Sequence, residues 1–476
     1  MIENHVAVER GRLLRILGVG FGLAVIIGNT IGAGILRTPG EVAAQLPDVW
    51  LFLGVWLVGG IYALLGAFSI SELGVMIPRS GGQYVFAQYA LGDYAGFIVG
   101  WSDWLSTCGT AAAVSIVIGE YLTDLFPFFA TAGEFLGNLI PFLSASNGVV
   151  IARVSIALAV VIVFAVLQWR GIRWGSATQN ITSLFKALAF VALIAACFLL
   201  GGKTPSEAEP ATIAAPDFFA VIIALQAVIY TYDGWTGVIY FSEEVRDPSR
   251  DIPRSMFGGV LAIMAIYMLV NIALVYVLPI WNIAGENLAL GAAADEIFGA
   301  QGGAIIKSLT IISMLSAINA YHLMASRVLF AMSSDKLVST KFASVNEGGT
   351  PTLALFASVM AAMIFILGGA FENSRRIFEN IIAALAFFFV VNYLMSYVSV
   401  FALRRREPLR ERPYRAWGYP VTTALTLVGS AAFLVGAVVS DIVNDQRNSL
   451  YALALLAASY PVYWLVKKSR QANTSE

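Results

Sequence analysis

The sequence predicts an all-α integral membrane protein with about twelve transmembrane helices, arranged as a five-plus-five inverted repeat and two extra C-terminal helices. Hydrophobic residues make up 58% of the 476 residues and charged residues only 12%, far below the roughly 25% of soluble domains. The mean hydropathy is +0.78. Two apolar stretches, five spans apart, are each interrupted in mid-membrane. Such a pattern is typical of secondary transporters built from inverted repeats.

The predicted spans run along the whole chain. A helix needs about 20 mostly apolar residues to cross a bilayer, and such stretches are centred near residues 25, 62, 108, 160, 188, 230, 266, 318, 360, 390, 428 and 457. We predict one transmembrane domain over residues 1–476. Its parts are a first repeat over about 13–201, a second over about 216–403, and extra helices over about 417–467. A short outer helix is expected over residues 286–298.

The basic residues predict the orientation of the spans. Lys and Arg gather in alternate connections, for example Arg246, Arg250 and Arg254, and again Arg404–Arg406. Cytoplasmic loops carry such an excess. Both termini are therefore expected in the cytoplasm of a multi-pass plasma membrane protein.

Cysteine and histidine content excludes several classes of protein. Cys108 and Cys197 both fall inside predicted spans, so neither a structural disulfide nor a disulfide-linked ancillary subunit is expected. The only histidines are His5 and His322, which offer no cluster for a metal or a catalytic triad. No cofactor and no nucleic-acid partner are expected. A membrane-embedded enzyme is disfavoured, and so is a channel, which would need repeated rings of carbonyls or charges.

The two interruptions are the informative feature. The first span is broken at Gly32, Ala33 and Gly34, and the sixth at Asp233 and Gly234. Broken helices in hydrocarbon expose N–H and C=O groups at several kcal/mol each unless the groups are satisfied. Glycine can also serve only packing in a membrane helix, but a second break at the corresponding place favours a binding site.

The two breaks offer opposite partial charges. The half-helix after Gly34 presents free N–H groups and a positive dipole end, which suit a carboxylate. The half-helix that ends near Thr231 presents carbonyls and a negative end, which suit an ammonium group. An α-amino acid carries both groups on one carbon. The sequence therefore predicts an amino acid site between the breaks.

Six segments also resemble a known family, the amino acid-polyamine-organocation transporters, and most closely its L-type amino acid transporter branch. They are "GNTIGAGIL", "SELGVMIPRSGGQYVFAQYALG", "TQNITSLFKALA", "YTYDGWTGVIYFSEEVRDPSRDIPRS", "SAINAYHLMASRVLFAMSSDKL" and "RPYRAWGYP". Together they cover nearly the whole chain in the order and spacing of the family. The resemblance implies the inverted-repeat fold and amino acid transport by alternating access.

The resemblance also implies roles for individual residues. The family's "GSG" corresponds to Gly32, Ala33 and Gly34, whose amides would hold the carboxylate. Alanine replaces the middle serine, so one side-chain hydroxyl is lost while the backbone donors remain. Carbonyls expected to accept from the ammonium group belong to Thr30, Tyr230 and Thr231. Tyr230 also stands where the branch carries an aromatic gate.

Lys186 lies in the middle of an apolar span, where an unpaired charge costs a few kcal/mol. Snorkelling to an interface is a poor alternative, because long apolar runs flank it on both sides. In the family, a lysine here resembles a tethered replacement for a sodium ion, bridging carbonyls at the first break and a hydroxyl of span eight, either Ser313 or Ser316. Sodium coupling is then not expected. Whether Lys186 is charged or neutral, and so whether a proton is coupled, stays open at this point.

Asp233 allows two interpretations. It could contact a cationic substrate group, or it could cap the second half of the broken helix, and we favour capping. The whole pattern predicts a sodium-independent transporter of L-amino acids, expected to be neutral ones, working as an exchanger or uniporter. The alternative is a proton-coupled symporter or antiporter of cationic amino acids or polyamines.

Overall fold

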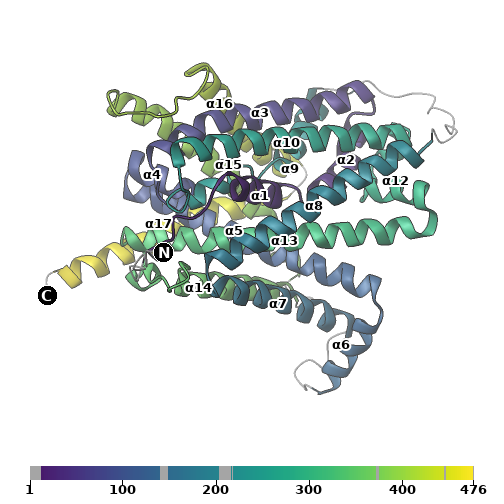
Figure 1. Ribbon diagram of the computed structural model, residues 1–476, viewed down its shortest axis with the longest axis horizontal. Helices are drawn as coiled ribbons and strands as arrows, with labels where there is room; N and C mark the ends of the chain where they lie inside the picture. The colour runs from purple at the N-terminus through teal and green to yellow at the C-terminus, as the bar shows by residue number, and fades with distance from the viewer. Residues whose placement is uncertain are drawn as a thin grey trace, which may run out of the picture.

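The computed structural model describes residues 12–139, 148–202, 216, 218–370, 375–443 and 446–474 (Figure 1). Within these ranges the regular elements are helices, and the only β-pairing is an isolated bridge between Leu17 and Val245. Ten helices are long and apolar enough to cross a membrane, and a bent pair adds an eleventh crossing. The shorter apolar helix α9, Phe218–Thr231, supplies the twelfth. The predicted all-α membrane fold of about twelve spans is confirmed.

The spans follow the chain in the predicted order. They are α1 with α2 (Val19–Thr30, Gly34–Gln45), α3 (Val49–Met76), α5 (Asp93–Leu125), α7 (Gly148–Trp169), α8 (Ile172–Leu200), α9 with the 3-10 helix η2 (Gly237–Phe241), α10 (Pro248–Val277), α13 (Gly302–Ser334), α14 (Thr352–Ala370), α15 (Arg375–Arg406), α16 (Val421–Val443) and α17 (Asn448–Thr474).

Short helices cover the two ends of the bundle. The end of α17, α4 (Gln83–Leu91) and the loop 407–420 lie at one end, on the left in Figure 1, which we call the C-terminal face. At the opposite face lie α6 (Phe128–Leu139) and α12 (Ala289–Phe298). The remaining short elements are α11 (Ile280–Ile283), η3 (Gly299–Gln301) and η4 (Thr340–Ala343). Helix α12 confirms the short helix expected over 286–298.

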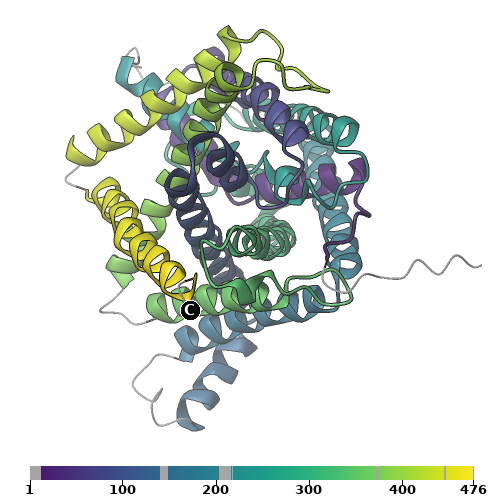
Figure 2. The same ribbon diagram turned by 90° about the vertical axis from the view of Figure 1, so that its left-hand side faces the viewer.

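The spans pack in two groups. Helices α1, α2, α3, α9 and α10 pack mainly on one another, and so do α5, α7, α13 and α14. Figure 2 looks along the spans, with α13 seen end-on near the middle of the bundle. Helix α8 contacts α1 and α10 of the first group and α13 of the second. The two broken spans therefore belong to one packed unit that faces the other.

Backbone pairing closes the C-terminal face beside the breaks. The amide of Leu17 donates to the Glu244 carbonyl at 2.9 Å, and the amide of Arg246 donates to the Leu17 carbonyl at 2.8 Å. Arg15 Nε donates to the Val245 carbonyl at 2.9 Å. The chain before α1 is thus fixed to the chain after η2, across the start of the first span.

A buried ion pair lies behind this pairing. The two guanidinium nitrogens Nε and Nη2 of Arg327, on α13, each donate to one carboxylate oxygen of Glu244 at 3.0 Å. Both side chains are 0% exposed. The guanidinium also lies 5.4 Å from the ring centroid of Phe241. Because each charge lacks water, each depends on the other for compensation.

Glu244→Gln should therefore destabilise the protein strongly, since it leaves the Arg327 guanidinium buried beside a neutral amide. Breaking such a pair costs about 3–5 kcal/mol, so the thermal unfolding midpoint of the purified protein should fall clearly. The matched control is Glu120→Gln, whose contact with Arg153 is 3.9 Å long with both side chains 32% exposed, and which should cost about 0–1 kcal/mol. Equal midpoints for the two variants would contradict this account.

Candidate substrate site at the two helix breaks

The first break presents unpartnered amides. Helix α1 ends at Thr30, α2 begins at Gly34, and the two helices are bent by 48°. Among the residues that the structure describes, the amides of Gly32, Ala33 and Gly34 meet no hydrogen-bond acceptor. These three residues are half-buried between fully buried neighbours, Ile31 and Ile35. An anion could therefore reach these donors at the N-terminus of α2.

The second break lies directly against the first. Helix α9 ends at Thr231, and Gly234 adopts φ +107°, a region that favours glycine. A Cβ at Gly234 would lie 2.9 Å from both Asn29 Nδ2 and Thr30 Oγ1. Asn29 Nδ2 also donates to the Gly234 carbonyl at 3.2 Å. The structure thus brings the two predicted breaks together at the end of α1.

The carbonyls expected to accept from an ammonium group already accept hydrogen bonds. Tyr267, buried on α10, places its hydroxyl 2.9 Å from the Thr30 carbonyl oxygen and 3.0 Å from that of Thr231. The Tyr230 carbonyl accepts from the amide of Asp233 at 3.1 Å. A carbonyl oxygen has two lone pairs. Each of these three oxygens can still accept a further hydrogen bond from a ligand.

Lys186 reaches the first break from the middle of α8. It is 1% exposed, and its Nζ donates to the Gly28 carbonyl at 2.7 Å and to the Ile31 carbonyl at 2.6 Å. Ser313 Oγ donates to the same Ile31 carbonyl at 2.8 Å. Lys186 and Ser313 therefore meet at one shared acceptor, which joins α8 and α13 to the break.

Ser316 belongs to a neighbouring polar cluster rather than to the surroundings of Lys186. Its hydroxyl lies 2.9 Å from Ser183 Oγ, and it accepts from Gln179 Nε2 at 3.2 Å. Ser183 Oγ donates to the Ala24 carbonyl at 2.7 Å. Of the two expected hydroxyls, Ser313 is the one that the structure brings to the break.

The expected capping role of Asp233 is wrong. The element after the break is the short 3-10 helix η2, whose N-cap is Thr236, with no side-chain cap bond. The Asp233 carboxylate instead accepts a 2.5 Å hydrogen bond from Tyr393 on α15. The ring of Tyr393 stacks on Trp235 at 5.1 Å. Asp233 thus ties the second break to α15, since the N-cap position of η2 belongs to Thr236, three residues further on.

A hollow of about 400 Å³ lies beside Tyr230, between α9, α15, α16 and α17. Its walls include the rings of Phe387 and Phe433, with Asp441 at its far end. Tyr230 is 46% exposed. Because Asp441 lies near the end of α16, the hollow extends from Tyr230, just before the second break, toward the face opposite the closed C-terminal face.

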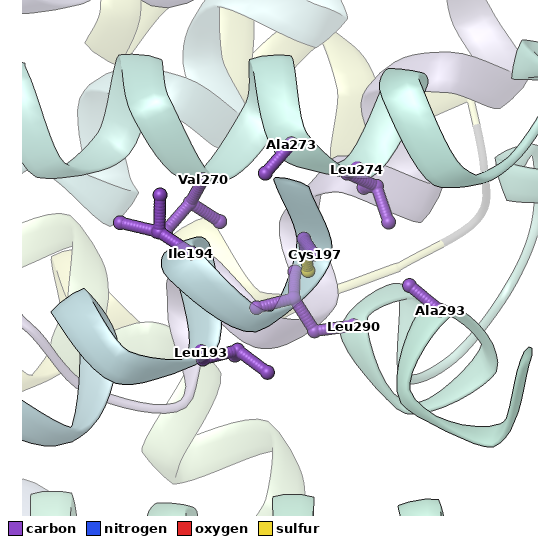
Figure 3. Close-up of a pocket in the computed structure, with 8 residues that line it drawn as sticks. All are labelled: Leu193, Ile194, Cys197, Val270, Ala273, Leu274, Leu290 and Ala293. Atoms are coloured by element: carbon purple, nitrogen blue, oxygen red, sulfur yellow. The ribbon is translucent and has the colours of Figure 1, made fainter. Parts of the chain in front are cut away.

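A second cavity, between α8, α10 and α12, is not a substrate site. Figure 3 shows its lining, which is apolar apart from Cys197 and includes Leu193, Val270 and Leu290. The enclosed space is about 10 Å³, no more than one water molecule would need. It has neither the room nor the polar groups for an amino acid.

Comparison with known proteins supports the same interpretation. The model of the amino acid permease family matches residues 22–460. The chain belongs to the amino acid permease family. It is 30% identical to the serine/threonine exchanger SteT of Bacillus subtilis (strain 168), over 97% of this chain and 99% of that protein. The resemblance found in the sequence is confirmed, and this permease is an amino acid transporter rather than an enzyme.

Two mammalian relatives extend the comparison. The permease is 27% identical to Asc-type amino acid transporter 1 of Mus musculus, over 96% of this chain and 82% of that one. It is 24% identical to the human b(0,+)-type amino acid transporter 1, over 94% of this chain and 87% of that one. The likeness therefore spans both breaks and all twelve spans.

Sequence reasoning missed two polar residues of this region. Tyr267 gave no signal, because a tyrosine in an apolar span is ordinary. Asp103, which lies in the third span within "WSDWL", did give one: an ionisable residue inside a membrane is costly and usually functional. The flanking Trp101 and Trp104 donate hydrogen bonds to the Leu455 carbonyl at 3.2 Å and to Ser358 Oγ at 2.9 Å.

Gly28→Ala should disrupt the first break. An added Cβ would lie 2.0 Å from Gln179 Nε2 and 2.6 Å from the hydroxyls of Ser183 and Ser316, so α1 must move away from α8 and α13. Overpacking of this kind costs about 1–3 kcal/mol, and both thermal stability and uptake should fall. Gly20→Ala in the same helix, with nothing within 4 Å of the added atom, should leave both unchanged. Tolerance of both substitutions would show that α1 is not fixed at Gly28.

Proposed function

We propose that this permease exchanges small L-amino acids, mainly neutral ones, across the plasma membrane, and that this exchange does not require sodium. The observation that carries the proposal is the contact between the two breaks. Free amides of Gly32, Ala33 and Gly34 lie on one side, and carbonyls of Thr30, Tyr230 and Thr231 lie on the other. A carboxylate and an ammonium group on one carbon would fit between them.

The positions of the two breaks support close spacing of these groups. A Cβ on Gly34 would lie 3.1 Å from Thr231 Cγ2, and Thr231 Oγ1 donates to Thr38 Oγ1 of α2 at 2.8 Å. The amide end of α2 therefore sits beside the carbonyl end of α9. Only a small zwitterion could span so short a gap, with its side chain directed past Tyr230 into the 400 Å³ hollow.

The hollow favours neutral substrates, although it also contains an acidic residue. Asp441 accepts a backbone hydrogen bond from Ser449, so part of its charge is already compensated within the protein. The remaining walls are mainly apolar or aromatic. Among the described lining residues Asp441 is the only charged one, so an apolar or hydroxylated side chain fits most of the hollow, whereas a cationic one could pair only with Asp441.

Lys186 supports independence from sodium. Its Nζ donates to the Gly28 and Ile31 carbonyls. Ser313 Oγ donates a second hydrogen bond to the Ile31 carbonyl. A cation bound there from solution would have to displace a tethered one. In this proposal Lys186 occupies the position of a bound sodium ion and holds the break as that ion would. Transport is then independent of the sodium gradient.

Alternating access follows from the two packed groups. The C-terminal face is closed by the Leu17 pairing and the Glu244–Arg327 pair, while the hollow extends toward the opposite face. We propose that rocking of the group with α1, α3, α9 and α10 against the other group opens each face in turn. Repeats over about 13–201 and 216–403, each beginning with a broken span, would provide the symmetry for such a movement.

The basic connections support placing the C-terminal face in the cytoplasm, in the plasma membrane. No disulfide-linked subunit is proposed, because Cys108 and Cys197 are both buried in spans. Exchange, rather than net flux, is supported by SteT, which is named a serine/threonine exchanger.

Counterflow in proteoliposomes tests the function directly. Unlabelled neutral amino acids inside should accelerate uptake of a labelled neutral amino acid, and replacing sodium by potassium outside should not change the rate. The reason is that both breaks recognise the α-groups and Lys186 occupies the cation position. Stimulation only by arginine or diamines, or a strict need for sodium, would reject the proposal.

Lys186→Ala should lower uptake at least about tenfold, because two buried carbonyls lose their donor and each unsatisfied group costs about 1–3 kcal/mol. The control is Lys307→Ala at the end of α13, where the lysine only pairs with Asp124 and is 32% exposed. Initial rates should be compared at equal amounts of folded protein. Uptake by the Lys186 variant at the rate of the control would remove Lys186 from the mechanism.

A further inference from the structure

Asp103 is a buried acid that the proposed exchange mechanism does not use. It lies on α5, is 0% exposed, and both of its carboxyl oxygens lie close to the hydroxyl of Tyr240, at 2.8 and 2.9 Å. Within the described ranges it has no other side-chain hydrogen bond and no cation within 4 Å. The Tyr240 phenol is therefore its one side-chain hydrogen-bond partner among the described residues, and the nearest acid that acts on it, Asp233 at the second break, repels a charge on Asp103.

The charged groups of the elements around α5 are engaged elsewhere or exposed. On α13, Arg327 pairs with Glu244 and Lys307 pairs with Asp124. Arg153 of α7 pairs with Glu120 and Asp124. Arg404 of α15 pairs with Glu72, and Arg79, beside α4, pairs with Asp335. His322 of α13 contacts the Ile318 carbonyl, Tyr84 of α4 donates to Asp335, and Tyr393 of α15 to Asp233. Arg405 of α15, Lys467 and Lys468 of α17, Tyr89 of α4 and Glu134 of α6 are exposed.

The geometry of the pair favours the protonated form. A phenol has one proton, so it can donate a full hydrogen bond to only one oxygen of an ionised carboxylate at a time. The other oxygen of the buried, charged group would then lack a donor. A protonated carboxyl group can donate to Tyr240 through one oxygen while accepting from Tyr240 through the other. Only this arrangement uses both short contacts and leaves no buried charge.

We propose that Asp103 is a proton-binding site that is occupied while the C-terminal face is closed. Tyr240 belongs to η2, in the second half of the broken span six, whereas Asp103 belongs to the opposing packed group. Gly82, at φ +66°, leaves room for the Tyr240 ring, which a Cβ would approach to 2.5 Å. The contact therefore bridges the two groups and forms only when η2 is fully docked.

Opening of the C-terminal face would separate Tyr240 from Asp103. The O–H bond of the carboxyl group then breaks, its proton passes to a water molecule entering from that face, and the bond re-forms on closing. Protonation thus stabilises the closed state, and deprotonation the open one. This coupling rests on the proposed alternating access, whereas proton binding in the closed state does not.

Infrared spectroscopy of the purified protein without substrate tests the proton site. The wild type at neutral pH should show the carbonyl stretch of a buried protonated carboxyl group, and Asp103→Asn should lack it. Asn has nearly the same shape and can make the same two hydrogen bonds to Tyr240, so the fold should be kept. Asp335→Asn, at an acid paired with Arg79, is the control and should retain the band.

Tyr240→Phe provides a second variant with a different signature. It should keep the band but shift its frequency, because the carbonyl oxygen loses its donor. A wild type without the band, or a band that survives in Asp103→Asn and is lost in Asp233→Asn, would overturn the proposal. These readouts need no amino acid, so they are independent of whether exchange itself is confirmed.

The transport consequence can be measured in oriented proteoliposomes. Acidifying the side that faces the C-terminal end should slow counterflow by the wild type, because protonation favours the closed state. Asp103→Asn should be slower than the wild type and insensitive to that pH. The same pH dependence in the variant would overturn the coupling.

Discussion

The structure depends on one constraint: two helices are interrupted inside a membrane, and the peptide groups released there need partners that lipid cannot provide. Lys186 and Ser313 satisfy carbonyls at the end of α1, and Tyr267 bridges the carbonyls of Thr30 and Thr231. The amides at the start of α2 keep no protein partner among the described residues. We propose that a zwitterion binds there, between these unpaired donors and acceptors that still have a free lone pair.

The same partners connect the breaks to helices outside their own packed group. Lys186 reaches α1 from α8, Ser313 from α13, and Tyr393 holds Asp233 from α15. Satisfying the breaks and joining them to helices outside their own packed group are therefore one set of contacts. A ligand that changes the hydrogen bonding of the breaks must also change how the groups are held, which is the physical requirement for coupling binding to movement.

Two buried acids on the C-terminal side of the breaks have different hydrogen-bond partners. Glu244 has a guanidinium with two matched hydrogen bonds, so it can stay charged without water. Asp103 has only a phenol. The first acid holds the closed face through a buried ion pair, whereas in our proposal the second holds it in the neutral form.

The sequence by itself determined the spans, the positions of both breaks and the family, because these depend on local composition: a glycine pair, an apolar run or a lone lysine is visible without a partner. Only the tertiary structure decided which groups meet. Ser313 rather than Ser316 faces the Ile31 carbonyl, Asp233 turns to α15 instead of capping, and Tyr267 bridges the breaks. Asp103 and Tyr240 are 137 residues apart in the chain. Such pairings are set by how helices pack, which no local pattern records.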